Sequence, residues 1–138
     1  MFKHDGHCPI WEKAATFSSK EQWFRDHLLC PRCGSIPRER ALMKVIGDFY
    51  PNWRALKIHE TCGRGASVKL DECDGYTASQ YYLDIEPGRP HPISGYRCEN
   101  LEKLTFPDES FDLFVSLGVR HRQFHRREGQ YADRHHCD

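Results

Sequence analysis

Apolar positions in the middle of the chain predict alternating short strands and helices. Residues 55–59 form an apolar-rich run that predicts a strand ending at Glu60, and residues 76–81 and 97–101 are two further strand candidates. The run Phe111–Val115 is apolar at four of its five positions, which predicts a strand buried on both faces. Strands that alternate with helical segments are typical of an α/β fold with a parallel sheet.

A helix is predicted between these strands and the amino-terminal part of the chain. It starts after Ser35, which can cap its first turn, tolerates Pro37 in that turn, and ends before Pro51. We expect Arg38 and Arg40 of the first turn to lie on its solvated face. The apolar stripe at helical spacing consists of Ala41, Leu42, Val45, Ile46 and Phe49.

The cysteines near the amino terminus have a spacing typical of metal ligands. Cys30 and Cys33 form a C-x-x-C pair followed by glycine, a sequence that lets two thiolates point at one ion. Cys8 is the third candidate, but Trp11 stands where a second C-x-x-C pair would need its cysteine. A histidine is therefore left as the fourth ligand, with His4, His7 and His27 as the candidates. We predict zinc on Cys8, Cys30, Cys33 and His7; the simpler alternative is a pair of half-buried thiols in a turn.

The segment after the first predicted strand has features of a cofactor-binding turn. Glu60 ends the strand, Gly63 and Gly65 form a Gly-x-Gly turn, and residues 68–70 begin a helix. Glycines let the backbone approach a ligand closely, and a carboxylate suits an amine or a hydroxyl better than a pyrophosphate. The turn therefore favours a positively charged nucleoside over a dinucleotide. A nicotinamide dehydrogenase is a weaker alternative, because the third glycine of G-x-G-x-x-G is missing.

Several of these segments together resemble one enzyme family. Residues 100–113 closely resemble the stretch leading into the fourth strand of class I S-adenosylmethionine-dependent methyltransferases. Residues 97–101 are similar to the adenine-contacting segment of that family, with Asn100 where aspartate is usual, and residues 58–65 are similar to its first motif. Residues 30–38 resemble the cysteine-bearing extension of one bacterial subgroup. The resemblance covers about residues 6–116, with its motifs in the family order.

This resemblance implies a fold, a cofactor and a set of cofactor-binding residues. The fold is an incomplete Rossmann-like doubly wound parallel sheet, over residues 37–116, preceded by a small Cys-rich module over residues 1–36. The cofactor is S-adenosylmethionine, with zinc in the module. The implied cofactor-binding residues are Glu60, Gly63, Gly65, Gln80, Glu99, Asn100, Leu101 and Ser116. No catalytic residue is implied, and the methyl acceptor is unknown.

Residues 117–138 break the pattern of the rest of the chain. Three further strand–helix units of about 30 residues each would complete the fold, and this segment is too short for them. Its His121 and His125 have a spacing that can ligate metal on a helix, and His135, His136 and Cys137 add donors, but no apolar face anchors the segment. We therefore hypothesise a truncated or frame-shifted end, which would leave an incomplete methyltransferase whose activity is an open question. The alternative is a non-catalytic zinc-binding interaction module with a remnant α/β domain.

The amino-acid composition limits the classes of partner and the cellular location that we expect for the chain. Lys and Arg number 20 and Asp and Glu number 20 among 138 residues, so the net charge of zero gives no strong nucleic-acid signal. No apolar run reaches the ~18 residues of a membrane span, and the first residues lack the apolar core of a secretory signal. Seven cysteines, an odd number, are then expected as thiols or metal ligands in a cytoplasmic protein.

Overall fold

The computed structural model describes residues 1–62 and 67–117, and within the latter range the side chains from residue 69 onward. The chain divides into two units, which we call the first and the second unit. The first unit combines Met1–Leu56 with Arg64–Tyr76, and the second combines Lys57–Gly63 with Thr77–Asp138. The division expected from the sequence, at residues 36 and 116, stays a prediction.

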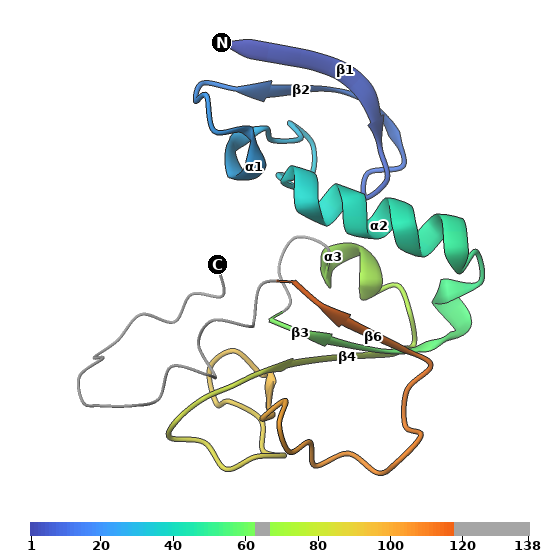
Figure 1. Cartoon of the computed structure of the whole chain (residues 1–138), viewed down its shortest axis with the longest axis vertical. Coiled ribbons are helices and arrows are strands. Elements are labelled where there is room, and N and C mark those ends of the chain that lie inside the picture. Colours follow the sequence, from blue (N-terminus) through green and yellow to red (C-terminus); the bar gives the residue numbers. More distant parts are fainter. Residues whose placement is uncertain (63–66, 118–138) are drawn as a thin grey trace. The chain divides into compact units, whose positions relative to one another are not determined.

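The first unit begins with a β-hairpin. Strands β1 (Phe2–Cys8) and β2 (Lys13–Ser19) pair antiparallel from Phe2 opposite Ser19 to Cys8 opposite Lys13 (Figure 1). Alternate residues of β2 face the interior, since Phe17 and Ser19 are both buried. An antiparallel bridge from Ser18 to Leu29 then ties the hairpin to the segment that carries Cys30. The hairpin, which carries Cys8, is therefore joined to the segment that carries Cys30 and Cys33.

Helix α2 (Pro37–Phe49) follows the one-turn helix α1 (Phe24–His27), and its bounds confirm the predicted helix. The predicted cap is wrong, because the backbone N–H of Ile36 donates to the Glu39 carboxylate at 3.0 Å and no side-chain cap is formed by Ser35. None of the helices in residues 1–62 and 67–117 is long and apolar enough to cross a membrane.

The apolar stripe predicted for α2 is correct at Ile46 but wrong at Val45 and Phe49, which are exposed. The helix buries Glu39, Arg40 and Met43 in addition to Ile46. The physical reason is that Arg40 packs inward, with its guanidinium carbon 4.2 Å from the ring centre of Phe17 in the hairpin. That contact determines which face of the helix is buried. The spacing of apolar residues alone does not predict it.

Two short elements complete the first unit. The 3-10 helix η1 (Trp53–Ala55) follows α2, and α3 (Ser67–Leu70) is a single turn at the position where the sequence predicts a helix. Trp53, Leu70 and Cys73 are buried, and the Cys73 thiol donates to the Leu56 carbonyl at 2.8 Å. These residues give the first unit apolar burial beyond the hairpin.

The second unit contains a four-stranded parallel sheet. Its strands are β3 (Lys57–Thr61), β4 (Gly75–Gln80), β5 (Arg97–Cys98) and β6 (Leu113–Ser116), in the order β5-β4-β3-β6 (Figure 1). Ile58 lies opposite Leu113 and Thr61 opposite Ser116, while Gln80 lies opposite Cys98. The predicted α/β fold with a Rossmann-like parallel sheet, preceded by a small Cys-rich module, is confirmed; that the module contains a β-hairpin was not predicted.

The strand order reverses once along the chain. From β3 the chain steps to β4 and then to β5 on one side, and β6 then adds on the other side of β3. Open parallel sheets bind ligands at such a reversal, beyond the carboxyl ends of the two diverging strands. The reversal here lies between β3 and β6.

Aromatic rings pack around a buried histidine in this sheet. His59 is fully buried, and its ring centre lies 4.9–5.0 Å from those of Phe106, Phe111 and Phe114. Burial lowers the pKa of His59, so the ring is neutral near pH 7, with Nε2 2.7 Å from the Ser79 hydroxyl. The aromatic cluster joins β3 to β6 and to the loop before it.

The prediction that residues 111–115 are buried on both faces is wrong. Val115 is buried, but Phe114 is 47% exposed. Among the described strands β6 lies at the edge of the sheet, so only β3 supports it from the side. An apolar run predicts two covered faces only when the strand is central.

We predict that the interior of the second unit is tightly packed at β3. Ile58→Val removes a methylene from a side chain with no exposed surface and should lower the free energy of unfolding by about 0.5–1.5 kcal/mol. The matched control is Ile93→Val, at a side chain that is 91% exposed. Urea unfolding measures both, and equal midpoints for the two variants would contradict the packing described.

Candidate functional site

Three cysteines of the first unit form the clearest candidate site. The sulfur atoms of Cys8, Cys30 and Cys33 all lie within 4.8 Å of one another, and those of Cys8 and Cys33 are 3.7 Å apart. With Zn–S bonds of about 2.3 Å, the edge of a tetrahedral zinc–thiolate site is about 3.8 Å. The distance between Cys8 and Cys33 therefore matches that edge, and the three sulfurs together form a group that could hold a zinc ion.

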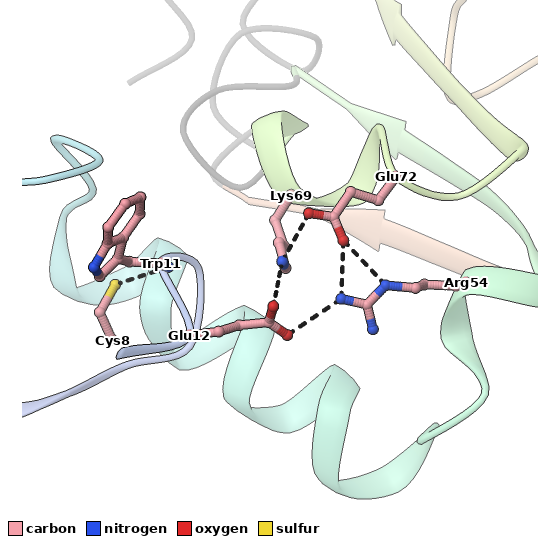
Figure 2. Close-up of polar contacts among 6 residues, drawn as sticks. All are labelled: Cys8, Trp11, Glu12, Arg54, Lys69 and Glu72. Carbon is pink, nitrogen blue, oxygen red and sulfur yellow. Dashed lines mark hydrogen bonds and ion pairs between the residues drawn. The ribbon is translucent and has the colours of Figure 1, made fainter. Parts of the chain in front are cut away.

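Backbone hydrogen bonds hold the two cysteine segments in this arrangement. The Gly34 N–H donates to the Cys30 carbonyl at 2.9 Å and the Cys30 N–H to the Ser35 carbonyl at 3.0 Å, closing the loop around the C-x-x-C pair. Gly34 has a φ of 70°, a conformation that favours glycine. On the hairpin side, the Trp11 N–H donates to Cys8 Sγ at 3.4 Å (Figure 2). The cluster thus depends on local turns at both ends.

The two thiols of the C-x-x-C pair differ in acidity. Burial raises the pKa of Cys30, but hydrogen bonds from the backbone of Cys33 and Arg32 outweigh it, so the pKa lies below its usual value. Burial raises the pKa of Cys33 above its usual value, although the hydroxyl and backbone of Ser35 oppose the shift. Metal binding requires thiolates. Cys30 is therefore the thiol of this pair that ionises more readily.

A buried arginine accompanies the cluster. Arg40 is 8% exposed; its guanidinium donates to the Ser35 carbonyl and, at 2.8 Å, to the Leu28 carbonyl. Burial lowers the pKa of Arg40, and the negative charge of the three cysteines opposes that shift. The expectation that Arg40 lies on a solvated face is wrong, because its side chain spans the loop between β2 and α2.

The predicted zinc ligands divide into two groups. The structure brings Cys8, Cys30 and Cys33 together, which confirms them as a cluster that can bind zinc. His7 precedes Cys8 on β1 and is exposed, since neighbouring strand residues point to opposite faces. Within residues 1–62 and 69–117, no histidine, cysteine or carboxylate joins the three as a fourth member. No other residue in the described part of the chain supplies the fourth ligand, which Trp11 cannot provide.

A network of four charged residues lies beside the hairpin turn in the first unit. Lys69 Nζ is 2.8 Å from Glu12 Oε2 and 2.7 Å from Glu72 Oε1, and Arg54 Nη2 is 3.2 Å and 2.8 Å from the other oxygens of the same carboxylates (Figure 2). The Lys69 side chain is 7% exposed. Because burial penalises an unpaired ammonium, the two carboxylates are what allow Lys69 to be buried.

The second candidate site is the carboxyl edge of the parallel sheet. Glu60 is buried near the end of β3, Ser116 ends β6 and lies opposite Thr61, and Gln80 ends β4. The Gln80 carbonyl accepts a hydrogen bond from the Glu99 N–H at 3.1 Å. Asn100 and Leu101 follow directly. These predicted cofactor residues come from neighbouring strand ends in the second unit, whereas Gly63 and Gly65 lie outside the described residues.

Two of the predicted cofactor residues also organise the loop after β5. The Glu99 carboxylate accepts hydrogen bonds from Arg97 Nε at 2.6 Å and from the Thr105 N–H at 2.9 Å. Burial raises the pKa of Glu99, but its hydrogen bonds to Thr105 and Arg97 outweigh this and hold the pKa below its usual value. The Asn100 side-chain oxygen accepts from the Glu102 N–H at 3.0 Å. Both side chains therefore fix the loop 99–105.

The sequence analysis missed a polar residue at this edge. Thr61 is 3% exposed, and its hydroxyl has no hydrogen-bond partner among the described residues. A buried hydroxyl without a partner is unfavourable by about 1–3 kcal/mol, so a ligand that hydrogen-bonds to it would be stabilised. Its place directly after Glu60, at the end of a predicted strand, was the available signal.

Comparisons with known proteins give no relative for this chain: no family model, no curated protein and no solved structure matches it. The resemblance to class I methyltransferases stays a resemblance in sequence motifs.

We predict that the charge network stabilises the first unit above pH 4.5 and fails in acid. Hydrogen bonds to Lys69 and Arg54 hold the pKa of Glu12 and of Glu72 below its ordinary value of 4.5. A lowered pKa in the folded state stabilises the protein above the ordinary value, and that stabilisation is lost as the pH falls through the folded-state pKa. Glu12→Gln should lower the free energy of unfolding by about 0.5–1 kcal/mol at pH 7.

Urea unfolding at pH 7 and at stepwise lower pH measures this effect. The difference between wild type and Glu12→Gln should shrink as the pH falls below 4.5. The control is Glu86→Gln, whose partner Arg89 is 3.8 Å away with both side chains exposed. A Glu12→Gln difference that stays constant down to pH 3 would rule out the network as its source.

We predict about one zinc ion per purified chain, bound through the cysteine cluster. Cys33→Ser removes one of the three sulfurs and should lower the zinc content at least about tenfold. Cys98→Ser is the matched control, since Cys98 is buried in the second unit and donates to the Ile85 carbonyl at 3.3 Å. Elemental analysis after dialysis measures the zinc content of each variant. Equal zinc contents in the two variants would exclude the cluster as the binding site.

Proposed function

We propose that the second unit is the cofactor-binding part of a class I S-adenosylmethionine-dependent methyltransferase. The observation that carries the proposal is the strand order β5-β4-β3-β6 with its reversal between β3 and β6. The reversal is where Rossmann-like sheets bind nucleoside cofactors, and Glu60 and Thr61 lie buried at the adjoining end of β3.

The residues at this edge suit the chemistry of the cofactor. S-adenosylmethionine carries a positive sulfonium, an amine and two ribose hydroxyls, all of which pair favourably with carboxylate and hydroxyl oxygens. Glu60 and the Thr61 hydroxyl provide such oxygens on β3, and Gln80 and Asn100 add amide groups at the neighbouring strand ends. A pyrophosphate would instead be repelled by the Glu60 carboxylate. The edge therefore favours a cationic nucleoside over a dinucleotide.

The transfer itself is a displacement at carbon. S-adenosylmethionine, held by Glu60 and Thr61 on β3, would supply an electrophilic methyl group, and the electron pair of the broken sulfur–methyl bond would stay on the sulfur of S-adenosylhomocysteine. The protein's part is to hold the sulfonium and the acceptor in line. No described residue is assigned as a catalytic base, and the acceptor is left open.

The cysteine cluster favours a second candidate function, a zinc-binding interaction module. It rests on the three sulfurs within 4.8 Å in the first unit and needs no cofactor in the second unit. The two candidates differ in one measurable property, because only the methyltransferase binds an adenosyl cofactor. Zinc content is compatible with both and does not discriminate between them.

We predict that the full chain binds S-adenosylhomocysteine and that Glu60→Gln weakens the affinity at least about tenfold, through loss of the carboxylate charge. Isothermal titration calorimetry measures the dissociation constants of both proteins. Thr61→Val, nearly isosteric, should also weaken binding, by severalfold. Glu102→Gln, at an exposed side chain in the loop after β5, is the control that should bind as wild type does.

Thermal melts without ligand separate loss of binding from loss of folding, since Glu60 and Thr61 are buried. Absence of heat from the well-folded wild-type chain, at cofactor concentrations up to the millimolar range, would refute the methyltransferase proposal. In that case the zinc-binding module is the function that stands.

A further inference from the structure

We propose that the cysteine cluster binds zinc with three thiolates and keeps its fourth coordination position open to a small exogenous thiol. This inference concerns the first unit alone and does not depend on the proposed methyl transfer. The cluster offers three sulfur ligands, whereas a tetrahedral zinc ion needs four. One ligand is therefore missing.

The position that would close the site carries a residue that cannot ligate. Trp11 lies three residues after Cys8, as Cys33 lies three after Cys30. Its backbone N–H still donates to Cys8 Sγ at 3.4 Å (Figure 2). The turn thus keeps the N–H···S contact of a metal-binding loop, while the second side chain of that loop is an indole.

The nearest polar side chain does not replace the missing ligand. Ser35 Oγ lies 3.1 Å from Cys33 Sγ and 3.9 Å from Cys8 Sγ. A neutral hydroxyl is not among the usual zinc ligands, and Arg40 Nη1 approaches the same oxygen at 3.4 Å. Ser35 is therefore assigned a hydrogen bond to sulfur rather than a bond to the metal.

The charge around the cluster suits three thiolates and an exchangeable ligand. A Zn²⁺ ion with three thiolates carries a net charge of −1, and the buried guanidinium of Arg40, which donates to the Ser35 and Leu28 carbonyls, offsets it. A neutral water then completes the site without excess charge. Sites with three protein ligands and a water are the ones that admit an outside ligand.

The cluster is open to solvent on the side of one cysteine. Cys8 and Cys30 are buried, whereas Cys33 is partly exposed and Trp11 is 40% exposed. Apart from Gly34 and its chain neighbours Cys33 and Ser35, no atom of the described residues lies within 4 Å of the place where a side chain would begin on Gly34. A small ligand can therefore approach past Cys33, and a zinc ion already bound by thiolates prefers sulfur as a further soft ligand.

The test uses the full chain loaded with Co²⁺ in place of zinc and titrated with 2-mercaptoethanol, the probe thiol. The probe thiol should displace the bound water and bind as a thiolate, with its proton released to the buffer. Absorption from sulfur-to-cobalt charge transfer should then rise saturably by about one third, as three thiolates become four. Trp11→Cys should show the four-thiolate spectrum before any thiol is added and should not change on titration. Trp11→Ser removes the indole without adding a strong ligand and should respond as wild type does.

Each other outcome overturns the proposal. A wild-type spectrum that does not respond means that the chain itself closes the fourth position. If the absorption of the Trp11→Cys protein still rises on titration, residue 11 does not occupy the fourth coordination position. If Trp11→Cys does not fold, wild type and Trp11→Ser still decide, because both must respond for the open position to exist, with a solution of Co²⁺ and thiol as the blank.

Discussion

The close approach of three cysteine sulfurs is the constraint on which the first unit depends. Thiolates repel one another, so three ionised cysteines within 4.8 Å of one another need a compensating positive charge. Arg40 supplies one such charge from α2, and a metal ion would supply the larger one. The same arginine packs on Phe17 of the hairpin. The rotation of α2, the closure of the C-x-x-C loop and the position of β2 are therefore linked through one side chain.

The second unit follows a different constraint, the parallel register of its strands. Pairing Ile58 with Leu113 and Thr61 with Ser116 places the carboxyl ends of β3 and β6 side by side. Residues far apart in the chain meet there because parallel strands share an edge. The aromatic cluster around His59 joins the same two strands, so packing and register support each other at the point where the ligand is proposed.

Much of this could be predicted from the sequence, and the errors in burial share one cause. Local patterns located β3, β4 and β5 to within a few residues, the bounds of α2, and the three cysteines that cluster. They failed wherever a distant contact decided the outcome: Arg40 is buried because of Phe17 and the carbonyls of Leu28 and Ser35. Phe114 is exposed because β6 lies at the edge of the described sheet. Periodicity reports which residues are apolar, not which neighbour covers them.

The turn between β1 and β2 joins the cysteine cluster to the charge network. Trp11 binds Cys8 Sγ through its backbone, and the next residue, Glu12, carries the carboxylate that pairs with Lys69 and Arg54 (Figure 2). Glu12 has a φ of 60°, an unfavourable conformation for a residue with a side chain, so the contacts on either side must hold it. A metal ion on Cys8 would fix one side of this turn, and the buried ammonium of Lys69 fixes the other. Loss of the metal would thus loosen the residue that lets Lys69 be buried, and the stability of α3 would fall together with that of the hairpin.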